Sequence, residues 1–150
     1  MAFLRWTLVL CLSVVSALAS PQGGERDPHQ WVQHAIQLHQ QGRYEEAIAE
    51  YEAFLARYPD VADIHSNLGA AYVSVGKIDK ALEHYQKALS LGTAENPQAV
   101  RLNLGLAYYK AARFQEAARE FETLLRQSPD LFQAALLLGD CYFRAGQYSK

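Results

Sequence analysis

The stretch Gly76-Lys77-Ile78-Asp79-Lys80-Ala81 has three counterparts along the chain. They are Gly42-Arg43-Tyr44-Glu45-Glu46-Ala47, Ala112-Arg113-Phe114-Gln115-Glu116-Ala117 and the shorter Gly146-Gln147-Tyr148. Steps of 34, 36 and 34 residues separate the four copies. A fixed step of this size is typical of a stacked array of one supersecondary unit, in which each unit packs on its neighbours. Such arrays present long surfaces to other molecules, so the repeat favours a binding function over catalysis.

Length and charge narrow the class of protein further. A chain of 150 residues favours one domain, and its 50% apolar and 20% charged residues are ordinary for a globular protein. The formal net charge is −2. Nucleic-acid binding needs a basic face, so we expect no nucleic-acid partner.

The N-terminal segment differs from the rest of the chain. A basic start ending at Arg5 precedes an apolar run from Trp6 to Val15, and the small-residue pattern Ala17-Leu18-Ala19 follows. This order predicts a secretory signal peptide over residues 1–19 and a periplasmic or secreted protein. The alternative is a membrane anchor, but the run is short for a span of about 20 residues. Residues 20–27 then form a flexible linker.

Each repeat unit is predicted to be a pair of helices. In the second unit, apolar residues fall at helical spacing over residues 62–75 and 78–91, and a left-handed glycine, Gly76, closes the first helix. Pro59 and Pro129 end second helices, because proline lacks the N–H and clashes with the preceding turn. Asp60 and Asp130 are expected to face the positive end of the next helix.

The third unit is expected to begin differently. Asn96-Pro97 is an insertion of two residues, so the loop before this unit should be longer, with Pro97 starting the next helix.

These motifs resemble the tetratricopeptide repeat, whose pattern is W-x2-L-G-x2-Y, then A-x3-F, then P. The second unit has Leu68-Gly69-x2-Tyr72 and Ala81-x3-Tyr85, and the third has Leu104-Gly105-x2-Tyr108, Ala117-x3-Phe121 and Pro129. The fourth opens with Leu138-Gly139-x2-Tyr142, while the first is looser, with Trp31, Ala47-x3-Tyr51 and Pro59. The resemblance implies an all-α, right-handed superhelical solenoid of antiparallel helix pairs. Its repeats would span 28–61, 62–95 and 98–131, with an incomplete one at 132–150.

The repeated small and aromatic residues are expected to form the core. Gly69, Gly105 and Gly139 would let a facing helix approach closely, and the aromatic residues would fill the space beside these contacts. The single cysteine outside the signal peptide, Cys141, lies in an apolar stretch and is expected to be a buried, inert thiol.

The resemblance also implies a site, because the first helices of this family line a concave groove. The matching columns give fourteen candidate groove residues: Val32, Ile36, His39, Asn67, Ala70, Val73, Leu102, Asn103, Leu106, Tyr109, Leu136, Asp140, Phe143 and Arg144. Lys110 follows on the same face. The apolar stripe among them suits an apolar or amphipathic peptide. The alternative is that neighbouring helices cover part of the stripe.

Some members of this family clamp a C-terminal carboxylate with lysine and arginine beside asparagine. Asn67 and Asn103 match the asparagine column, but Val32 and Ala99 stand where lysine is needed. A carboxylate clamp is therefore not expected, and the two asparagines are predicted to form hydrogen bonds between helices.

No pattern indicates a catalytic, metal or cofactor site. His29, His34 and His39 are five residues apart, which scatters them around a helix. The chain has no H-E-x-x-H, P-loop or G-x-S-x-G motif. We expect no enzyme activity, no cofactor and no small-molecule substrate.

The C-terminal helix, expected over residues 131–145, is apolar where a terminal repeat normally has a polar outer face. We interpret the chain as the front of a longer protein; the alternative is that this end binds a partner or a second copy. The sequence thus predicts a non-catalytic scaffold outside the cytoplasm that binds a peptide or protein in the groove. The alternative is the recognition arm of a longer enzyme or sensor.

Overall fold

The computed structural model describes residues 26–146, and within this range the chain forms seven helices and no strand. The expected signal peptide, most of the linker and the residues after Gly146 lie outside the described residues. The helices are α1 (Pro28–Gln40), α2 (Tyr44–Arg57), α3 (Ala62–Ser74), α4 (Ile78–Leu91), α5 (Pro97–Lys110), α6 (Phe114–Gln127) and α7 (Phe132–Arg144).

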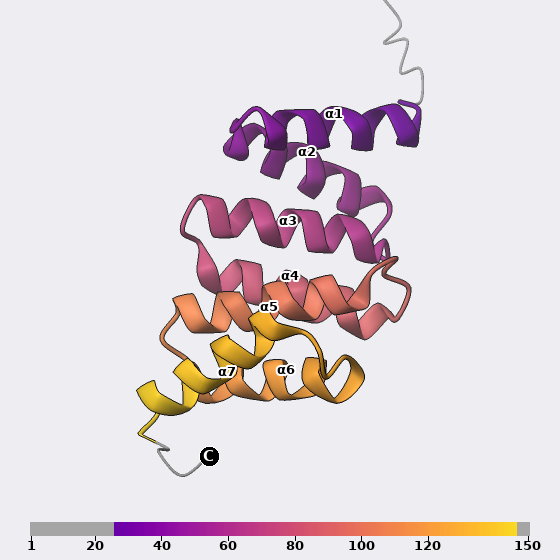
Figure 1. Cartoon of the computed structure of the whole chain (residues 1–150). Coiled ribbons are helices and arrows are strands. Elements are labelled where there is room, and N and C mark those ends of the chain that lie inside the picture. Colours follow the sequence, from indigo (N-terminus) through magenta and orange to yellow (C-terminus); the bar gives the residue numbers. More distant parts are fainter. Residues whose placement is uncertain (1–25, 147–150) are drawn as a thin grey trace, which may run out of the picture.

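The helices form a solenoid of antiparallel pairs and not a closed bundle. Each helix packs mainly on the helices before and after it, while α1 with α3 and α3 with α5 make small additional contacts. Figure 1 shows the helices stacked in chain order, from α1 at the top to α6 and α7 at the bottom. The predicted all-α fold class is therefore confirmed.

Left-handed residues close the first helix of each pair, as predicted. Gly42, Gly76 and Gly146 have φ values of 75°, 75° and 72°. Ala112 occupies the same place after α5 with a φ of 57°, and it is the one non-glycine residue between 26 and 146 with positive φ. A Cβ in this region meets the following carbonyl oxygen, so this turn carries strain that the glycine turns avoid.

The second helices α2 and α6 end before proline, and α5 begins at proline. Residues Tyr58 and Ser128 cap α2 and α6, and Pro59 and Pro129 follow them. Asn96 caps α5 by accepting a hydrogen bond from the Ala99 backbone N–H at 2.9 Å. The longer loop and the start of α5 at Pro97 are as predicted.

The two aspartates expected at helix starts, Asp60 and Asp130, lie one residue before the caps of α3 and α7. The residues that cap α3 and α7 are Val61 and Leu131, and neither helix has a side-chain cap. Asp60 lies one residue too early to cap α3, and its carboxylate instead pairs with the Lys87 ammonium of α4 at 3.2 Å.

The core follows the repeated small and aromatic residues. A Cβ added at Gly69 would lie 2.9 Å from the Tyr85 ring, and one added at Gly105 would lie 2.6 Å from the Phe121 ring. Glycine is needed at both places because the facing ring occupies the space of a side chain. Gly139 differs, since a Cβ there would meet nothing within 4 Å.

A polar link joins the two helices of each complete pair. It connects the fourth residue of α1 and α3, and the fifth of α5, to the seventh residue of the second helix. The contacts are Trp31 Nε1 to Glu50 at 2.6 Å, His65 Nδ1 to His84 Nδ1 at 3.0 Å, and Arg101 to Glu120 at 2.7 Å. The column in the repeat is constant and the chemistry changes, so these buried and half-buried groups are satisfied in three different ways.

A second link joins each pair to the next. The tyrosine of the L-G-x2-Y motif bonds to the preceding second helix: Tyr72 donates to Glu52, Tyr142 donates to Glu122, and Tyr108 accepts from the Gln86 amide at 2.6 Å. Burial and the Glu52 carboxylate raise the pKa of Tyr72 to about 12, because both disfavour the phenolate.

The last helix is the least covered. Phe132, Leu136 and Phe143 of α7 are 73%, 60% and 65% exposed, whereas α1 turns Gln30, Gln33, His34 and Gln37 outward. On its packed side α7 buries Cys141, as predicted, and burial raises the pKa of its thiol to about 11. Among residues 26–146, no helix is long and apolar enough to span a bilayer.

Candidate functional site

The fourteen predicted groove residues lie on α1, α3, α5 and α7, the first helices of the pairs, and we call this set the groove face. None of them is buried. Leu136, Phe143 and Arg144 are exposed, and the others are half-buried. Neighbouring helices thus cover part of the stripe, while every member keeps some surface open to a ligand.

The N-terminal part of the groove face is lined by aromatic contacts. The His39 ring lies edge-on to Tyr44, with centroids 5.4 Å apart, and to Tyr51 at 6.5 Å. Burial lowers the pKa of His39, because the surrounding rings cannot solvate an imidazolium. Val32 and Ile36 lie on the same helix and are half-buried against the core.

The middle part contains a cavity of about 250 Å³ between α3 and α5. It is lined by Val73, Tyr85, Asn103, Leu106, Ala107, Tyr109 and Lys110. Four of these were predicted groove residues. The adjacent second-helix residue Tyr85 reaches the cavity from α4, behind the two first helices.

The predicted role of the two asparagines is wrong. Within residues 26–146, neither the Asn67 nor the Asn103 side chain makes a hydrogen bond, although both residues are half-buried. The helices are instead linked by the two columns of polar contacts described above, which leaves the asparagine amides open to solvent or to a ligand.

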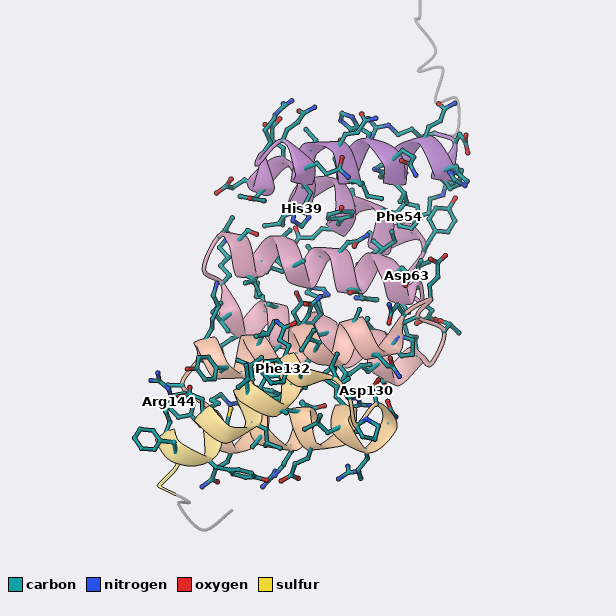
Figure 2. All side chains as sticks on the ribbon, in the orientation of Figure 1. His39, Phe54, Asp63, Asp130, Phe132 and Arg144 are labelled. Carbon is teal, nitrogen blue, oxygen red and sulfur yellow. The ribbon has the colours of Figure 1, made fainter. Side chains whose placement is uncertain are left out.

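The C-terminal part of the groove face is bridged by charge. The Tyr109 hydroxyl donates to the Asp140 carboxylate, and Arg144 Nε donates to the same carboxylate at 2.7 Å. The Arg144 guanidinium also lies 5.4 Å from the Tyr109 ring centroid and 5.6 Å from that of Phe114. Figure 2 marks Arg144 near the C-terminal end of α7 and Phe132 near its N-terminal end.

This bridge stabilises the ionised carboxylate. The hydrogen bond from Tyr109, and then that from Arg144, holds the pKa of Asp140 below its ordinary value. The same bond raises the pKa of Tyr109. Tyr109 and Asp140 were both predicted as ligand groups, but their polar atoms already bind each other, so they are less free than Asn103 to meet a partner.

Tyr85 lines the cavity but was not among the predicted site residues. It was assigned to the core, and its ring is indeed packed against Gly69. The sequence did contain a signal for this residue. The equivalent position in the next repeat is Phe121, so packing at this position does not need the hydroxyl that Tyr85 carries.

No metal centre is formed by the groove face. Across the part of the chain that the structure describes, no three His, Cys, Asp or Glu side chains gather closely enough to hold a metal ion.

Comparison with known proteins decides the family. A model of the tetratricopeptide repeat matches residues 33–100 and 102–150. The chain belongs to the tetratricopeptide repeat family. This fold is generally a non-catalytic scaffold for protein interactions.

Curated relatives of this tetratricopeptide repeat protein differ greatly in length. It is 30% identical over 115 residues to the protein CTR9 homolog of Arabidopsis thaliana, which covers 75% of this chain and 10% of that protein. It is 25% identical over 144 residues to the photosystem I assembly protein Ycf3 of Synechococcus sp. (strain CC9605), covering 91% of this chain and 81% of that protein. The chain thus spans about a tenth of the CTR9 homologue.

Solved tetratricopeptide repeat structures superpose well on the chain. A MamA mutant, D159K, is 25% identical with a TM-score of 0.73, over 81% of this chain and 66% of that one. The first repeat domain of Spaghetti (RPAP3), bound to an HSP90 peptide, is 21% identical with a TM-score of 0.71, over 79% of this chain and 93% of that one. At this identity, the second likeness shows the fold alone.

Proposed function

We propose that this protein is a non-catalytic scaffold that binds a peptide or protein partner on its groove face. The observation that carries the proposal is the cavity between α3 and α5, which opens in the middle of an otherwise half-buried apolar stripe. Open apolar surface flanked by a few polar groups is typical of peptide-binding grooves. The repeat domain of RPAP3, which has the same fold, was solved with a bound peptide, and this supports the proposed mode.

The proposed partner does not end in a clamped carboxylate. Val32 and Ala99 replace the lysines that such a clamp needs, and the candidate groove is apolar around them. An internal apolar or amphipathic segment fits this surface better.

A selection with phage-displayed random peptides tests the groove. Peptides selected on the wild-type chain are expected to lose binding to the double variant Leu102→Asp/Leu106→Asp, because two carboxylates would be buried without partners. The control is Ala53→Asp, at an exposed position of the second helix α2. The groove proposal fails if the selected peptides bind the double variant unchanged.

We also propose that the protein acts outside the cytoplasm. The support is the order of basic, apolar and small residues over 1–19, which is typical of a secretory signal. The intact mass of the native protein from its envelope or secreted fraction tests this. A chain that begins at Ser20 is expected, and a chain that retains Met1 contradicts export by cleavage.

A second candidate function is that these repeats are the recognition arm of a larger enzyme or sensor. It is favoured by the CTR9 homologue, of which the matched region is only 10%. The same mass measurement separates the two, because a larger protein exceeds the mass of the 150-residue chain.

Self-association is a further proposed use of α7, favoured by its exposed Phe132, Leu136 and Phe143. Light scattering tests it: the mass is expected to rise with protein concentration and to stay monomeric in Leu136→Glu. A wild-type monomer at high concentration overturns it.

A further inference from the structure

The cavity between α3 and α5 is the right size for one side chain. Its volume is about 250 Å³, below the range of about 300–1,000 Å³ that is common for drug-sized ligands. A water molecule has a share of about 30 Å³ in the liquid, so the cavity holds several waters or one large side chain. Its walls are mainly apolar, with Val73, Leu106 and Ala107 among them.

One residue that lines the cavity, Tyr85, has a hydroxyl without a hydrogen-bond partner among the described residues. Tyr85 is only 2% exposed, and its hydroxyl makes no hydrogen bond with any described residue. By contrast, Tyr72, Tyr108 and Tyr142 each use the hydroxyl in a link between repeats. Within residues 26–146 no fully buried side-chain oxygen or nitrogen lacks a partner, so the Tyr85 hydroxyl keeps some accessible surface, and Tyr85 is one of the residues that line the cavity.

Two more polar groups stand at the wall and rim without partners. The half-buried Asn103 amide makes no hydrogen bond among the described residues, and the exposed Lys110 ammonium makes no ion pair among them. Lys110 is the one charged residue that lines the cavity. A buried hydroxyl and a half-buried amide without partners lose hydrogen bonds that a ligand can restore.

The positive charge of Lys110 at the rim therefore favours a partner with an acidic group. No carboxylate lines the cavity, and the Asp140 carboxylate, which accepts from the lining residue Tyr109, is itself paired with Arg144. An acidic group on the ligand meets an unpaired cation at Lys110 and no repulsion from the lining residues.

We propose that this cavity is the specificity pocket of the groove, and that it takes one large aliphatic side chain of a peptide whose neighbouring residue is acidic. This inference rests on the proposed function and names the partner more closely. The aliphatic side chain packs against Val73, Leu106 and Ala107. Tyr85 and Asn103 bond to the peptide backbone, and Lys110 pairs with the acidic neighbour.

Three small capped peptides probe the pocket directly in the full 150-residue chain. N-acetyl-Leu-Glu-amide carries both features, N-acetyl-Leu-Lys-amide reverses the charge, and N-acetyl-Ala-Glu-amide lacks the large aliphatic group. Nuclear magnetic resonance titration follows the side-chain amide of Asn103, with Asn67 as the internal control outside the cavity. Leu-Glu is expected to shift the Asn103 signal at lower concentration than either mismatched peptide, with Asn67 unmoved.

Point variants with matched controls test the named groups. Tyr85→Phe removes only the hydroxyl, and the equivalent Phe121 shows that the fold accepts this ring. It is expected to weaken binding of the Leu-Glu peptide by about threefold to tenfold, the value of one hydrogen bond. Tyr51→Phe makes the same change in the preceding repeat, away from the cavity, and is expected to leave binding unchanged.

The charge is tested in the same way. Lys110→Gln is expected to weaken Leu-Glu binding by about twofold to fivefold, as for an exposed ion pair, and to abolish the preference over Leu-Lys. Lys77→Gln, at an exposed lysine outside the cavity, is the matched control. Equal responses to all three peptides overturn the pocket proposal, as does an Asn103 signal that no peptide shifts.

The two proposals fail in distinguishable ways. If selected phage peptides still depend on Leu102 and Leu106 but bind the Tyr85→Phe and Lys110→Gln variants like wild type, the groove stands and the pocket is wrong. If selected peptides ignore the groove double variant as well, both are wrong.

Discussion

Ala112 carries the clearest strain of any single residue in the described chain. Its left-handed φ of 57° is held at a turn where the other units use glycine. A left-handed conformation costs a non-glycine residue about 1–2 kcal/mol, and the greater flexibility of glycine in the unfolded chain returns part of this. The repeat itself therefore identifies a stabilising substitution.

Ala112→Gly is expected to raise the free energy of unfolding by about 0.5–1 kcal/mol. Denaturant unfolding followed by circular dichroism measures it. The reciprocal control is Gly76→Ala, with φ 75° and open space around it, which is expected to lower stability by a similar amount. An Ala112→Gly variant that is less stable than wild type would contradict the inference that the left-handed conformation of Ala112 destabilises the fold.

The glycines of the L-G motif differ in what faces them. Gly105→Ala is expected to lower stability by about 1–3 kcal/mol, because the new Cβ would lie 2.6 Å from the buried Phe121 ring. Gly139→Ala is expected to raise stability by about 0.5–1 kcal/mol, since its surroundings are open and alanine favours the helix. Equal effects of the two substitutions would contradict this packing.

The role of a residue was predictable where a position of the repeat serves the same packing purpose in every unit. Glycine and alanine at the close contacts, and proline after the second helices, follow from local sterics that the sequence carries directly. The lack of a partner at the Tyr85 hydroxyl and at the Asn103 amide was not predictable, because the environment of such a group depends on side chains brought from other helices. The repeat pattern predicts where the Tyr85 ring packs, but it does not predict the hydrogen-bond partner of the hydroxyl.

Among the elements, the helices expected over residues 62–75, 78–91 and 131–145 match α3, α4 and α7 to within one residue, because turns and caps are local signals. The polar links between the helices were not predicted, since their partners are about twenty residues apart and change chemistry from pair to pair. His65 and His84 form the variant of this link that responds to pH. The Pro59 carbonyl accepts from His65 Nε2 at 2.9 Å, so neutral His65 offers Nδ1 as acceptor and His84 Nδ1 donates to it.

The second repeat is therefore expected to lose stability in mild acid. Burial, then repulsion from His65, lowers the pKa of His84, while Glu83 and Glu52 oppose the shift and Lys80 supports it. Because the folded pKa lies below the unfolded value of about 6.5, the stabilising effect is present above that pH. It is lost as the pH falls through the folded pKa.

Thermal unfolding at pH values of about 7.5 and 5.5 measures this loss. The double variant His65→Arg/His84→Glu copies the Arg101–Glu120 link of the third repeat and is expected to reduce the drop in Tm between the two pH values. If Tm falls as far in the double variant as in wild type, the His65–His84 pair is not the source of the acid sensitivity. The remaining acid sensitivity should come partly from His39, whose pKa is also lowered by burial.

At the scale of the whole molecule, a solenoid has no central core, so its stability is uneven along the array. The inner helices α2 to α6 pack on the helices before and after them, while α1 packs mainly on α2 and α7 mainly on α6. Hydrogen–deuterium exchange is expected to be slowest in α2 to α6 and fastest in α1 and α7. Uniform protection of all seven helices would contradict a stacked array.

Chemical-shift mapping with a phage-selected peptide measures directly whether the groove face binds a peptide. Shifted backbone signals are expected to gather on α3 and α5, around Val73, Asn103 and Leu106. Shifts gathered on the outward surfaces of α2, α4 and α6, with the groove face unmoved, would contradict it.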